Sequence, residues 1–332
     1  MAITDKQKKL LVLVADGEFH SGEELAEALG LSRSAIWKQL SGLAELGLHY
    51  TGVSGRGYRL ERRLELLNHA KISAALNDFS RASHVLFEIH DQLDSTNSYL
   101  VQKSLHGAAS GSACFAEHQT AGKGRRGRDW VSPFGGNIYL SILWRFPHNG
   151  LGEIAGLSLA IGVAVIRALK HLQIPDIGLK WPNDVCYQGK KLGGILIEVS
   201  GEAAGPCAAV IGVGLNVFLS GSEAEKINQP WTDLSKILGQ RKISRNTLAA
   251  CLLNELIPVL IDFEQSGIKT YLEEWRQYDV LKGNAARLFV GNQVIDGIVQ
   301  GIDDNGLLLL EHLGGRIQSY ASGEVSFNNA AV

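Results

Sequence analysis

Residues 178–217 read GLKWPNDVCYQGKKLGGILIEVSGEAAGPCAAVIGVGLNV, and this stretch decides the fold class. It holds three strand-like runs, at Gly178–Trp181, Ile195–Val199 and Ala208–Val217, with no helical pattern between them. Consecutive strands that are not separated by helices are typical of a mixed sheet rather than a doubly wound parallel one. The stretch therefore predicts an α+β fold with a central mixed β-sheet.

The whole chain divides into three predicted domains, over residues 1–63, 64–280 and 281–332, and the stretch above lies in the second. After Leu281, short strand-like runs are separated by Gly-Asn, Asp-Asn-Gly and Gly-Gly turns, as in a small SH3-like β-barrel. The middle domain has three further strand-like runs and three helical patterns: Val85–His90, Ser112–Glu117, Asn137–Trp144, a helix after Ser95, Leu151–Leu172 and Asn246–Gln265.

The first 60 residues predict three helices followed by a two-stranded hairpin. Ser21 and Ser32 are capping residues, and Gly30 ends the first of two helices that meet across a short turn. The segment Gly22–Ser41 has helix-turn-helix spacing, and Tyr50–Leu60 reads as a wing whose tip offers Arg56 to a phosphate backbone. The module resembles a winged helix, and the side chains expected to meet DNA are Ser32, Arg33, Ser34, Trp37 and Lys38.

Composition is that of ordinary globular domains. The 332 residues are 45% hydrophobic with a formal net charge of −2, so the chain can form two or three cores. The four cysteines have no short paired spacing, which argues against a disulfide framework or a zinc site and fits a reducing cytoplasm. The most apolar run, Ile154–Ile166, is too short to cross a bilayer, and we expect no membrane residence.

Gly122–Arg128 reads GKGRRGR, four cations on a glycine-rich backbone without an acidic residue. Glycines let the backbone turn and bring N–H groups close to an anion, while arginine binds phosphate oxygens in pairs. The segment predicts a phosphate clamp that is mobile until its anion arrives. A solvated basic turn or a nucleic-acid patch is the alternative if these residues stand alone.

Four other segments combine polar groups with strand ends. Asp94–Asn97 precedes a helix, where a simple N-cap is the alternative reading. Lys180–Asp184 lies at a strand end, where an Asx turn is the alternative. Lys191–Gly194 sets a cation before two glycines, so that backbone can press against a flat ligand. Gly212–Asn216 ends another strand with an amide, and tight packing explains it equally well.

Taken in order, these segments resemble the biotin protein ligases, and with the N-terminal module they look like the bifunctional members that also repress the biotin operon. The resemblance spans nearly the whole chain and implies a central sheet like that of class II aminoacyl-tRNA synthetases. Lys123 stands where the familiar repressor-type enzyme has arginine, which keeps the charge but loses the bidentate fork. The segments are Asp94–Asn97, Glu117–Gln119, Gly122–Trp130, Ser132–Asn137, Lys180–Asp184, Lys191–Gly194 and Gly212–Asn216.

The resemblance also implies substrates and residue roles. Biotin and ATP would form biotinyl-5′-AMP, with Mg²⁺ held by Asp184, and Lys191, Arg125 and Asp184 would carry the chemistry. Biotin would contact Ser95, Thr96, Asn97, Gln119, Lys123, Gly124, Arg125, Lys191 and Gly194. The adenylate or ATP would contact Gly122, Arg126, Arg128, Trp130, Asn183 and Asn216.

The implied partners are the biotin carboxyl carrier protein of acetyl-CoA carboxylase, biotin operator DNA, and a second copy of the chain when the adenylate is bound. Two alternatives remain open from the residues alone. One is a DNA-binding regulator that senses a ligand without ligase activity. The other is a lipoate ligase-like enzyme, whose head pocket would need to be more apolar than Ser95, Thr96 and Gln119 indicate.

Overall fold

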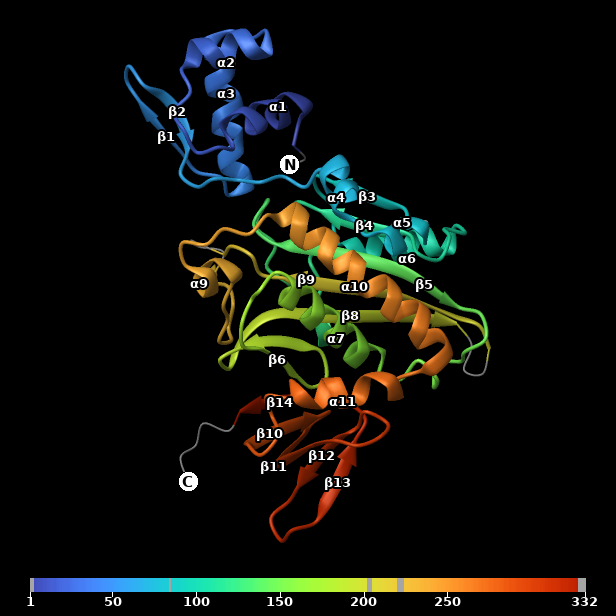
Figure 1. Cartoon of the computed structure of the whole chain (residues 1–332). Helices are drawn as coiled ribbons and strands as arrows, with labels where there is room; N and C mark the ends of the chain where they lie inside the picture. Colours follow the sequence, from blue (N-terminus) through green and yellow to red (C-terminus); the bar gives the residue numbers. More distant parts are fainter. Residues whose placement is uncertain (1–2, 84, 202–204, 220–223, 328–332) are drawn as a thin grey trace.

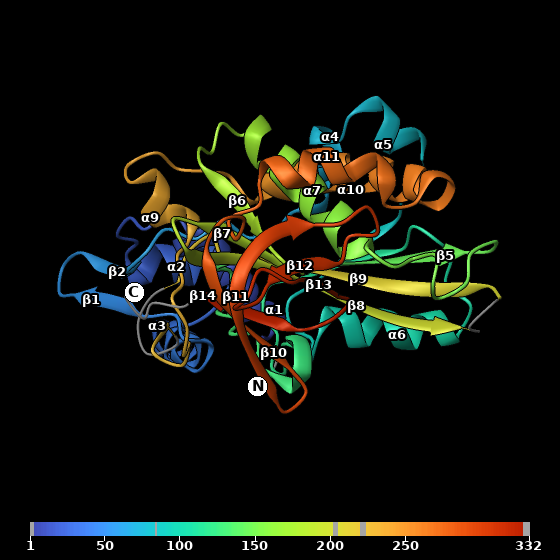
Figure 2. The same ribbon diagram turned by 90° about the horizontal axis from the view of Figure 1, so that it is seen from below.

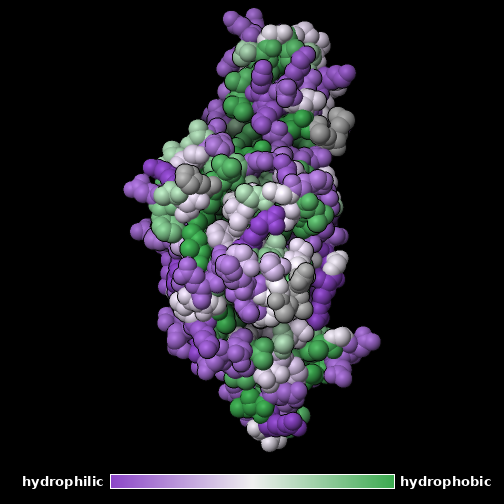
Figure 3. Space-filling model, turned by 90° about the vertical axis from the view of Figure 1, so that its right-hand side faces the viewer, coloured by the Kyte–Doolittle hydropathy of each residue, from purple (hydrophilic) through white to green (hydrophobic). Residues whose placement is uncertain are grey.

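The computed structural model describes residues 3–83, 85–201, 205–219 and 224–327. Three bodies follow one another from the N-terminal module, through a central sheet with its helices, to a C-terminal β domain (Figure 1). The α+β prediction is confirmed, because the central sheet is mixed and the C-terminal domain is an antiparallel sheet. On the face drawn in Figure 3, hydrophobic residues lie scattered among hydrophilic ones.

The N-terminal module has the predicted three helices and hairpin. Ser21 and Ser32 cap two of the helices by accepting backbone N–H groups three residues on, and Gly30 ends the first of these helices with φ +61°. The wing is a tight antiparallel hairpin in which Val53 pairs with Gly57. The elements are α1 (Asp5–Val14), α2 (Gly22–Leu29), α3 (Arg33–Leu43), the 3₁₀ turn η1 (Ala44–Leu46), β1 (Tyr50–Val53) and β2 (Gly57–Leu60).

The central sheet has seven strands in the order β3-β4-β5-β9-β8-β7-β6. Only the β3–β4 pair is parallel among the described strands, and the neighbouring pairs are antiparallel. The sequence does not predict the strand β7, because a proline at a strand end indicates termination, whereas Pro182 lies in the turn of the β6–β7 hairpin. The strands are β3 (Phe87–His90), β4 (Ala113–Ala116), β5 (Ile138–Phe146), β6 (Ile177–Lys180), β7 (Asp184–Tyr187), β8 (Lys190–Gly201) and β9 (Cys207–Leu215).

Helices cover both faces of this sheet. Figure 2 shows α7, α10 and α11 on one face and α6 on the other. The helix predicted from Leu151 begins only at Leu157, because Gly156 precedes it in a left-handed conformation with φ +82°. The helices are α4 (His69–Ala75), α5 (Asp78–Ala82), α6 (Thr96–Leu105), α7 (Leu157–His171), α9 (Leu234–Leu238), α10 (Arg245–Ser266) and α11 (Lys269–Gln277).

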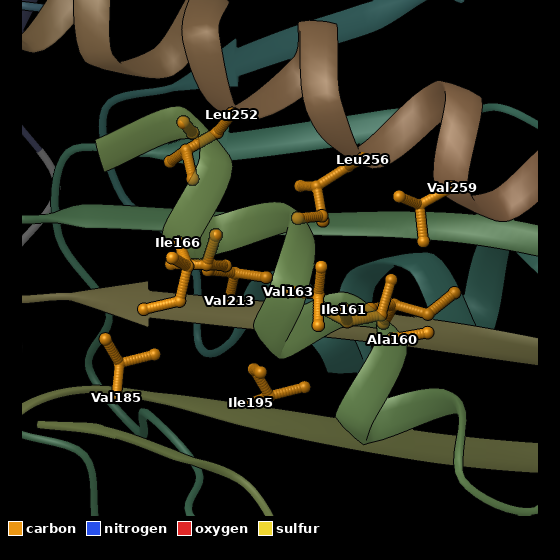
Figure 4. Packing of buried hydrophobic residues seen from close by; sticks show 14 of the residues in the cluster. Ala160, Ile161, Val163, Ile166, Val185, Ile195, Val213, Leu252, Leu256 and Val259 are labelled. Atoms are coloured by element: carbon orange, nitrogen blue, oxygen red, sulfur yellow. The ribbon is translucent and has the colours of Figure 1, made fainter. Parts of the chain in front are cut away.

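The main core lies where α7 and α10 pack side by side against one face of the sheet. Figure 4 shows Val163 and Ile166 of α7 next to Leu252 of α10 and to Val213 and Ile195 of the strands. A helix that is apolar on all sides is expected in such a buried position. The helix α10 is long and apolar enough to cross a membrane, but 61% of its most apolar window is buried within the protein. It is therefore accounted for as a core helix.

The C-terminal domain is a five-stranded antiparallel sheet in the order β13-β12-β11-β10-β14. Its buried residues belong to the same hydrophobic cluster as the central domain, and the indole Nε1 of Trp181 donates to the carbonyl of Gly306 at 3.1 Å. The two domains are thus packed as one unit. The strands are β10 (Ala285–Val290), β11 (Gln293–Ile302), β12 (Leu308–Glu311), β13 (Ile317–Tyr320) and β14 (Glu324–Phe327).

Candidate functional site

One pocket on the central sheet gathers most of the residues that the sequence singled out. It is a partly open pocket with both polar and apolar lining residues, as is usual for small-molecule sites. The walls come from the start of α6, the clamp, the β6–β7 turn, β8 and β9. The predicted residues that line it are Ser95, Thr96, Asn97, Gln119, Lys123, Gly124, Arg125, Arg126, Arg128, Trp130, Asn183, Asp184, Lys191 and Gly194.

Two of the predicted residues, Gly122 and Asn216, support the pocket rather than line it. The carbonyl of Gly122 accepts from the backbone N–H of Trp130 at 2.8 Å, so Gly122 fixes the base of the clamp. Asn216 is buried, and its Nδ2 donates to the carbonyl of Thr232 at 3.1 Å. We interpret Asn216 as an anchor for the chain that leaves β9.

The floor of the pocket is a buried network of neutral polar side chains. Gln119 Oε1 accepts from both the backbone N–H and the hydroxyl of Thr96, at 2.8 and 3.1 Å. Ser141 Oγ lies 2.8 Å from Thr96 Oγ1 and 2.6 Å from Asn97 Oδ1, and Asn97 Nδ2 donates to Glu198. Ser95 caps α6 beside this network. Because neutral donors and acceptors alternate here, the floor suits a ligand that has both.

Glycines on β8 and β9 form a wall against which an aromatic ring packs. A Cβ added at Gly214 would lie 2.7 Å from the indole of Trp130, and one at Gly194 would lie 3.3 Å from it. The Lys191 ammonium lies 5.6 Å from the centre of the same ring. The Trp130 Nε1 is buried without a hydrogen-bond partner in the described structure. The wall is therefore flat, apolar and faced by a cation.

Asp184 is the carboxylate at the centre of the pocket and lies between two lysines. Its oxygens lie 2.7 Å from Lys191 Nζ and 3.2 Å from Lys180 Nζ, and only 9% of the residue is exposed. Burial opposes the charge, but the two ammonium groups outweigh it, so the pKa of Asp184 is lowered from its ordinary value. The carboxylate remains ionised and holds both lysines in place.

The magnesium role predicted for Asp184 does not fit this arrangement. Both carboxylate oxygens face ammonium groups, and Mg²⁺ needs free oxygen ligands in an octahedral shell. The described residues contain no group of three or more His, Cys, Asp or Glu side chains that could hold a metal ion. We therefore conclude that Asp184 forms ion pairs with the two lysines, and we derive no step from a metal held by this chain.

The clamp is a short 3₁₀ turn, η2 (Arg125–Gly127), which is closed by a bond of 2.7 Å from Gly124 N–H to the carbonyl of Arg128. Arg125 donates to Asn183 Oδ1 at 3.0 Å and to the carbonyl of Gly323 at 3.3 Å. Arg126 takes positive φ at 56° and donates to the carbonyl of Phe289. Burial lowers the pKa of Arg125 from its ordinary value, although the guanidinium stays charged at neutral pH.

The C-terminal domain contributes to this site, because Gly323 and Phe289 accept hydrogen bonds from the clamp arginines. The sequence did not predict this contribution. Glu324, the first residue of β14, forms a pair of contacts of 2.5 and 2.7 Å with the Arg128 guanidinium. No local pattern distinguishes Glu324, because its partner lies 196 residues away in the chain. The other lining residues to which no role had been given are Asp129, Tyr139, Leu140, Ile195, Leu196, Gly212, Val213, Gly214 and Gln229.

A second candidate site lies on the N-terminal module. The five residues predicted to meet DNA are all exposed along the start of α3, and 57% of Trp37 is accessible. Arg56 at the wing tip is exposed, and its guanidinium lies 4.2 Å from the centre of the Phe19 ring, with Arg59 at 4.7 Å. This face combines exposed cations with a helix start, as a winged helix needs for contact with a phosphate backbone.

Comparisons with known proteins identify relatives for each part of the chain. Family models match residues 89–216 (Biotin/lipoate A/B protein ligase family), 6–59 (HTH domain) and 286–328 (Biotin protein ligase C terminal domain). The Bifunctional ligase/repressor BirA of Escherichia coli K12 is 42% identical over 322 residues, which are 97% of each chain.

Two other relatives cover less of the chain. The Biotin--[acetyl-CoA-carboxylase] ligase of Mycobacterium tuberculosis is 37% identical over 239 residues, 70% of this chain and 86% of that one. A solved structure of the biotin protein ligase from Aquifex aeolicus, in complex with biotin and ATP, matches with a TM-score of 0.61 and 28% identity. That match covers 72% of this chain and 97% of the Aquifex chain.

Proposed function

We infer the function from the relatives of the chain, which belongs to the family of bifunctional biotin protein ligase/repressors. The similarity to a member of this family covers 97% of the chain. It is a biotin--[acetyl-CoA-carboxylase] ligase that is joined to a DNA-binding repressor module. The observation that carries the enzymatic part is a single pocket in which a neutral polar floor lies beside Lys191 and a clamp of three arginines. The residue roles below are our proposals.

The floor of the pocket is proposed to bind the head of biotin. The ureido group of biotin has two N–H donors and one carbonyl acceptor. Thr96, Gln119 and Ser95 offer neutral hydroxyl and amide groups that match both kinds of atom without a charge. Gly194 and Gly214 leave room for the Trp130 indole, which would lie beside the bound rings. Lys123 and Gly124 would then lie over the valeryl chain.

In the first half-reaction, a carboxylate oxygen of biotin attacks the α-phosphorus of ATP. The new P–O bond replaces the bond to the β-phosphate, pyrophosphate leaves, and biotinyl-5′-AMP remains. A carboxylate and a polyphosphate repel each other, so cations must lower the cost of bringing them together. We assign this task to Lys191 and to the clamp residues Arg125, Arg126 and Arg128, with positioning as the second contribution.

Asp184 is proposed to position Lys191 rather than to react. Its buried carboxylate holds both Lys191 and Lys180, which prevents the ammonium of Lys191 from turning away. Asn183 holds Arg125 from the same turn. Mg²⁺ enters the proposal only as the ion that ATP carries on its phosphates, since both carboxylate oxygens of Asp184 already contact ammonium groups.

In the second half-reaction, the neutral amine of an acceptor lysine attacks the carbonyl carbon of the mixed anhydride. An amide bond forms, the bond to the phosphate oxygen breaks, AMP leaves, and the amine releases a proton. We propose the biotin carboxyl carrier protein of acetyl-CoA carboxylase as the acceptor. Until it arrives, the clamp and Trp130 would cover the adenylate and exclude water.

The repressor activity is proposed to depend on the same intermediate. Biotinyl-5′-AMP would stabilise a homodimer, because ordering of the clamp fixes neighbouring surface, and two winged helices would then meet a palindromic biotin operator. The carrier protein would compete for the dimer surface. The cytoplasm is the proposed compartment, and the four free cysteines are consistent with its reducing conditions.

Two substitutions test the enzymatic assignment. Arg125→Gly should leave adenylate synthesis measurable but speed release of the intermediate, because a charge-assisted contact to phosphate contributes about 1.5–3 kcal/mol. An unchanged dissociation rate of biotinyl-5′-AMP would contradict this role. Lys191→Ala should abolish most of the biotin-dependent exchange between pyrophosphate and ATP, and near-normal exchange would exclude the role of Lys191.

Arg56→Ala is the matched control, since it removes a cation of similar size from the wing. It should weaken binding to the DNA upstream of the chain's own gene in a gel shift while leaving ligase activity at the wild-type level. Incubation of the wild type with ATP, biotin and a carrier domain separates the ligase from a regulator that only senses its ligand. Absence of carrier biotinylation under these conditions would favour the sensor.

A further inference from the structure

The buried core of the N-terminal module includes a side chain from the central domain. Phe134 is 1% exposed and belongs to the same hydrophobic cluster as Leu10, Leu11 and Val14. Among the described residues, every other buried member of this cluster lies between Leu10 and Leu64. Phe134 thus completes the core of the module from outside it.

The backbone beside Phe134 is also fastened to the segment that leaves the module. Arg62 donates from Nη2 to the carbonyl of Phe134 at 2.7 Å, and its guanidinium lies 5.0 Å from the centre of the Phe218 ring. A Cβ added at Gly135 would lie 2.5 Å from Leu64, which shows how closely the loop approaches it. The loop of residues 132–137 and the exit of the winged helix are therefore in contact along several residues.

The other end of the same loop contacts the ligand pocket. Ser132 Oγ accepts from Gln119 Nε2 at 3.2 Å and donates to the carbonyl of Trp130 at 3.0 Å. Gln119 and Trp130 both line the pocket. Only Pro133 separates Ser132 from Phe134 in the chain. Phe134 therefore lies two residues from a side chain that contacts two pocket residues.

We propose that Phe134 is a positioning residue that couples occupancy of the ligand pocket to the placement of the DNA-binding module. The coupling rests on the proposed function, because it requires that biotin and ATP enter this pocket. A close-packed core transmits a shift instead of absorbing it, so the loop and the winged helix must move together. The effect is reciprocal, and contacts of the module with DNA would also change the affinity of the pocket for its ligand.

An ion pair at this boundary is a weaker candidate for the coupling. Lys8 forms an ion pair of 2.7 Å with Asp91, but their side chains are 47% and 31% exposed. Exposed pairs of this kind are screened by solvent and contribute little. Phe134 is buried on the module side and lies two residues from Ser132, whose hydrogen bonds reach pocket residues, which makes Phe134 the residue to test.

Hydrogen exchange of the full chain, followed by mass spectrometry with and without biotin plus ATP, tests the proposal. In the wild type, we expect ligand to slow exchange in the clamp and to change exchange in α3 by about fivefold or more, the lower end of allosteric effects. In Phe134→Ala, protection of the clamp should remain, while the change in α3 falls below about twofold. Phe134→Leu, which keeps an apolar side chain, should restore most of it.

Leu25→Ala is the matched control, because Leu25 is 1% exposed in the same cluster but belongs to α2. It should raise exchange of the module in both states and preserve the difference made by ligand. A ligand-induced change in α3 that persists in Phe134→Ala, or that is lost equally in Leu25→Ala, would overturn the proposal. If ligand leaves even the clamp of the wild type unprotected, the proposed function itself fails.

Discussion

Gly212→Ala should damage the pocket by a clash whose size the structure defines. Gly212 lies on β9 and lines the pocket, and an added Cβ would lie 2.3 Å from Asn97 Oδ1. Real Cβ atoms essentially never come closer than 3.0 Å to such an atom, so Asn97 must move by at least about 0.7 Å, the difference between these two distances. Asn97 is buried and accepts from Ser141 at 2.6 Å.

The cost of this movement has two parts. Overpacking of a filled site costs about 1–3 kcal/mol, and a buried polar atom that loses its partner costs about 1–3 kcal/mol. We expect the free energy of unfolding to fall by about 2–4 kcal/mol in urea titrations, because part of the strain relaxes. The affinity for biotin, measured by calorimetry, should fall at least about tenfold, since each 1.4 kcal/mol lost from binding is a factor of ten.

Two further variants make the reasoning refutable. Gly152→Ala is the matched control, because a Cβ at Gly152 meets no atom within 4 Å, and it should behave as the wild type. In an Asn97→Ala background, where the clashing amide is absent, adding Gly212→Ala should cost less than about 0.5 kcal/mol, the scatter expected of independent sites. An equal cost of Gly212→Ala with and without the Asn97 side chain would show that the clash is not the cause.

Three other predictions concern buried or charged groups in the three parts of the chain. Arg245→Met should lower the free energy of unfolding by about 3–5 kcal/mol in urea titrations, because the carboxylate of Glu117, which is 2% exposed, loses its cationic partner. Adding Glu117→Gln to this variant should recover part of the loss. The pKa of His20 is raised despite partial burial, because Asp16 and Glu24 accept hydrogen bonds from the imidazolium. This interaction therefore stabilises the fold fully below about pH 6.5, the pKa of an unfolded histidine. The stabilisation is lost as pH rises through the higher pKa of the folded state. Asp16→Asn should lower that pKa in an NMR titration, and an unchanged value would contradict the assignment. Glu324→Gln should change stability by less than about 1 kcal/mol but speed tryptic cleavage within the clamp, whereas cleavage at the wild-type rate would show that β14 does not restrain it.

Local signals in the sequence were sufficient to predict the helices and the hairpin of the N-terminal module. Ser21, Gly30 and Ser32 act through atoms within four or five residues, so their capping roles can be read from spacing, and the structure confirms them. The strand-rich centre was also predictable, because three apolar runs without intervening helices allow few other arrangements. The hairpin at Lys180–Asp184 was not, since a proline at a strand end indicates termination as readily as a tight turn.

The site was predictable only where the resemblance named its residues. The clamp, Lys191 and Asp184 come from separate segments, and no spacing shows that they line one pocket. Glu324 and Phe134 were not assigned to any role, because each acts through partners more than 60 residues away in the chain. The contacts of Asp184 could not be predicted for a similar reason, because Lys180 and Lys191 come close to its carboxylate only in the folded hairpin.

The continuous hydrophobic cluster that runs from Leu67 to Val325 has a consequence for how this protein can be cut and recombined. The buried residues of the C-terminal domain and of the central sheet form one core. A truncated chain that lacks the C-terminal domain would therefore expose part of that core to water. By contrast, the first sixty residues have an interior of their own apart from Phe134. Gene fusion or loss during evolution should therefore exchange the first segment readily and inherit the other two as one piece.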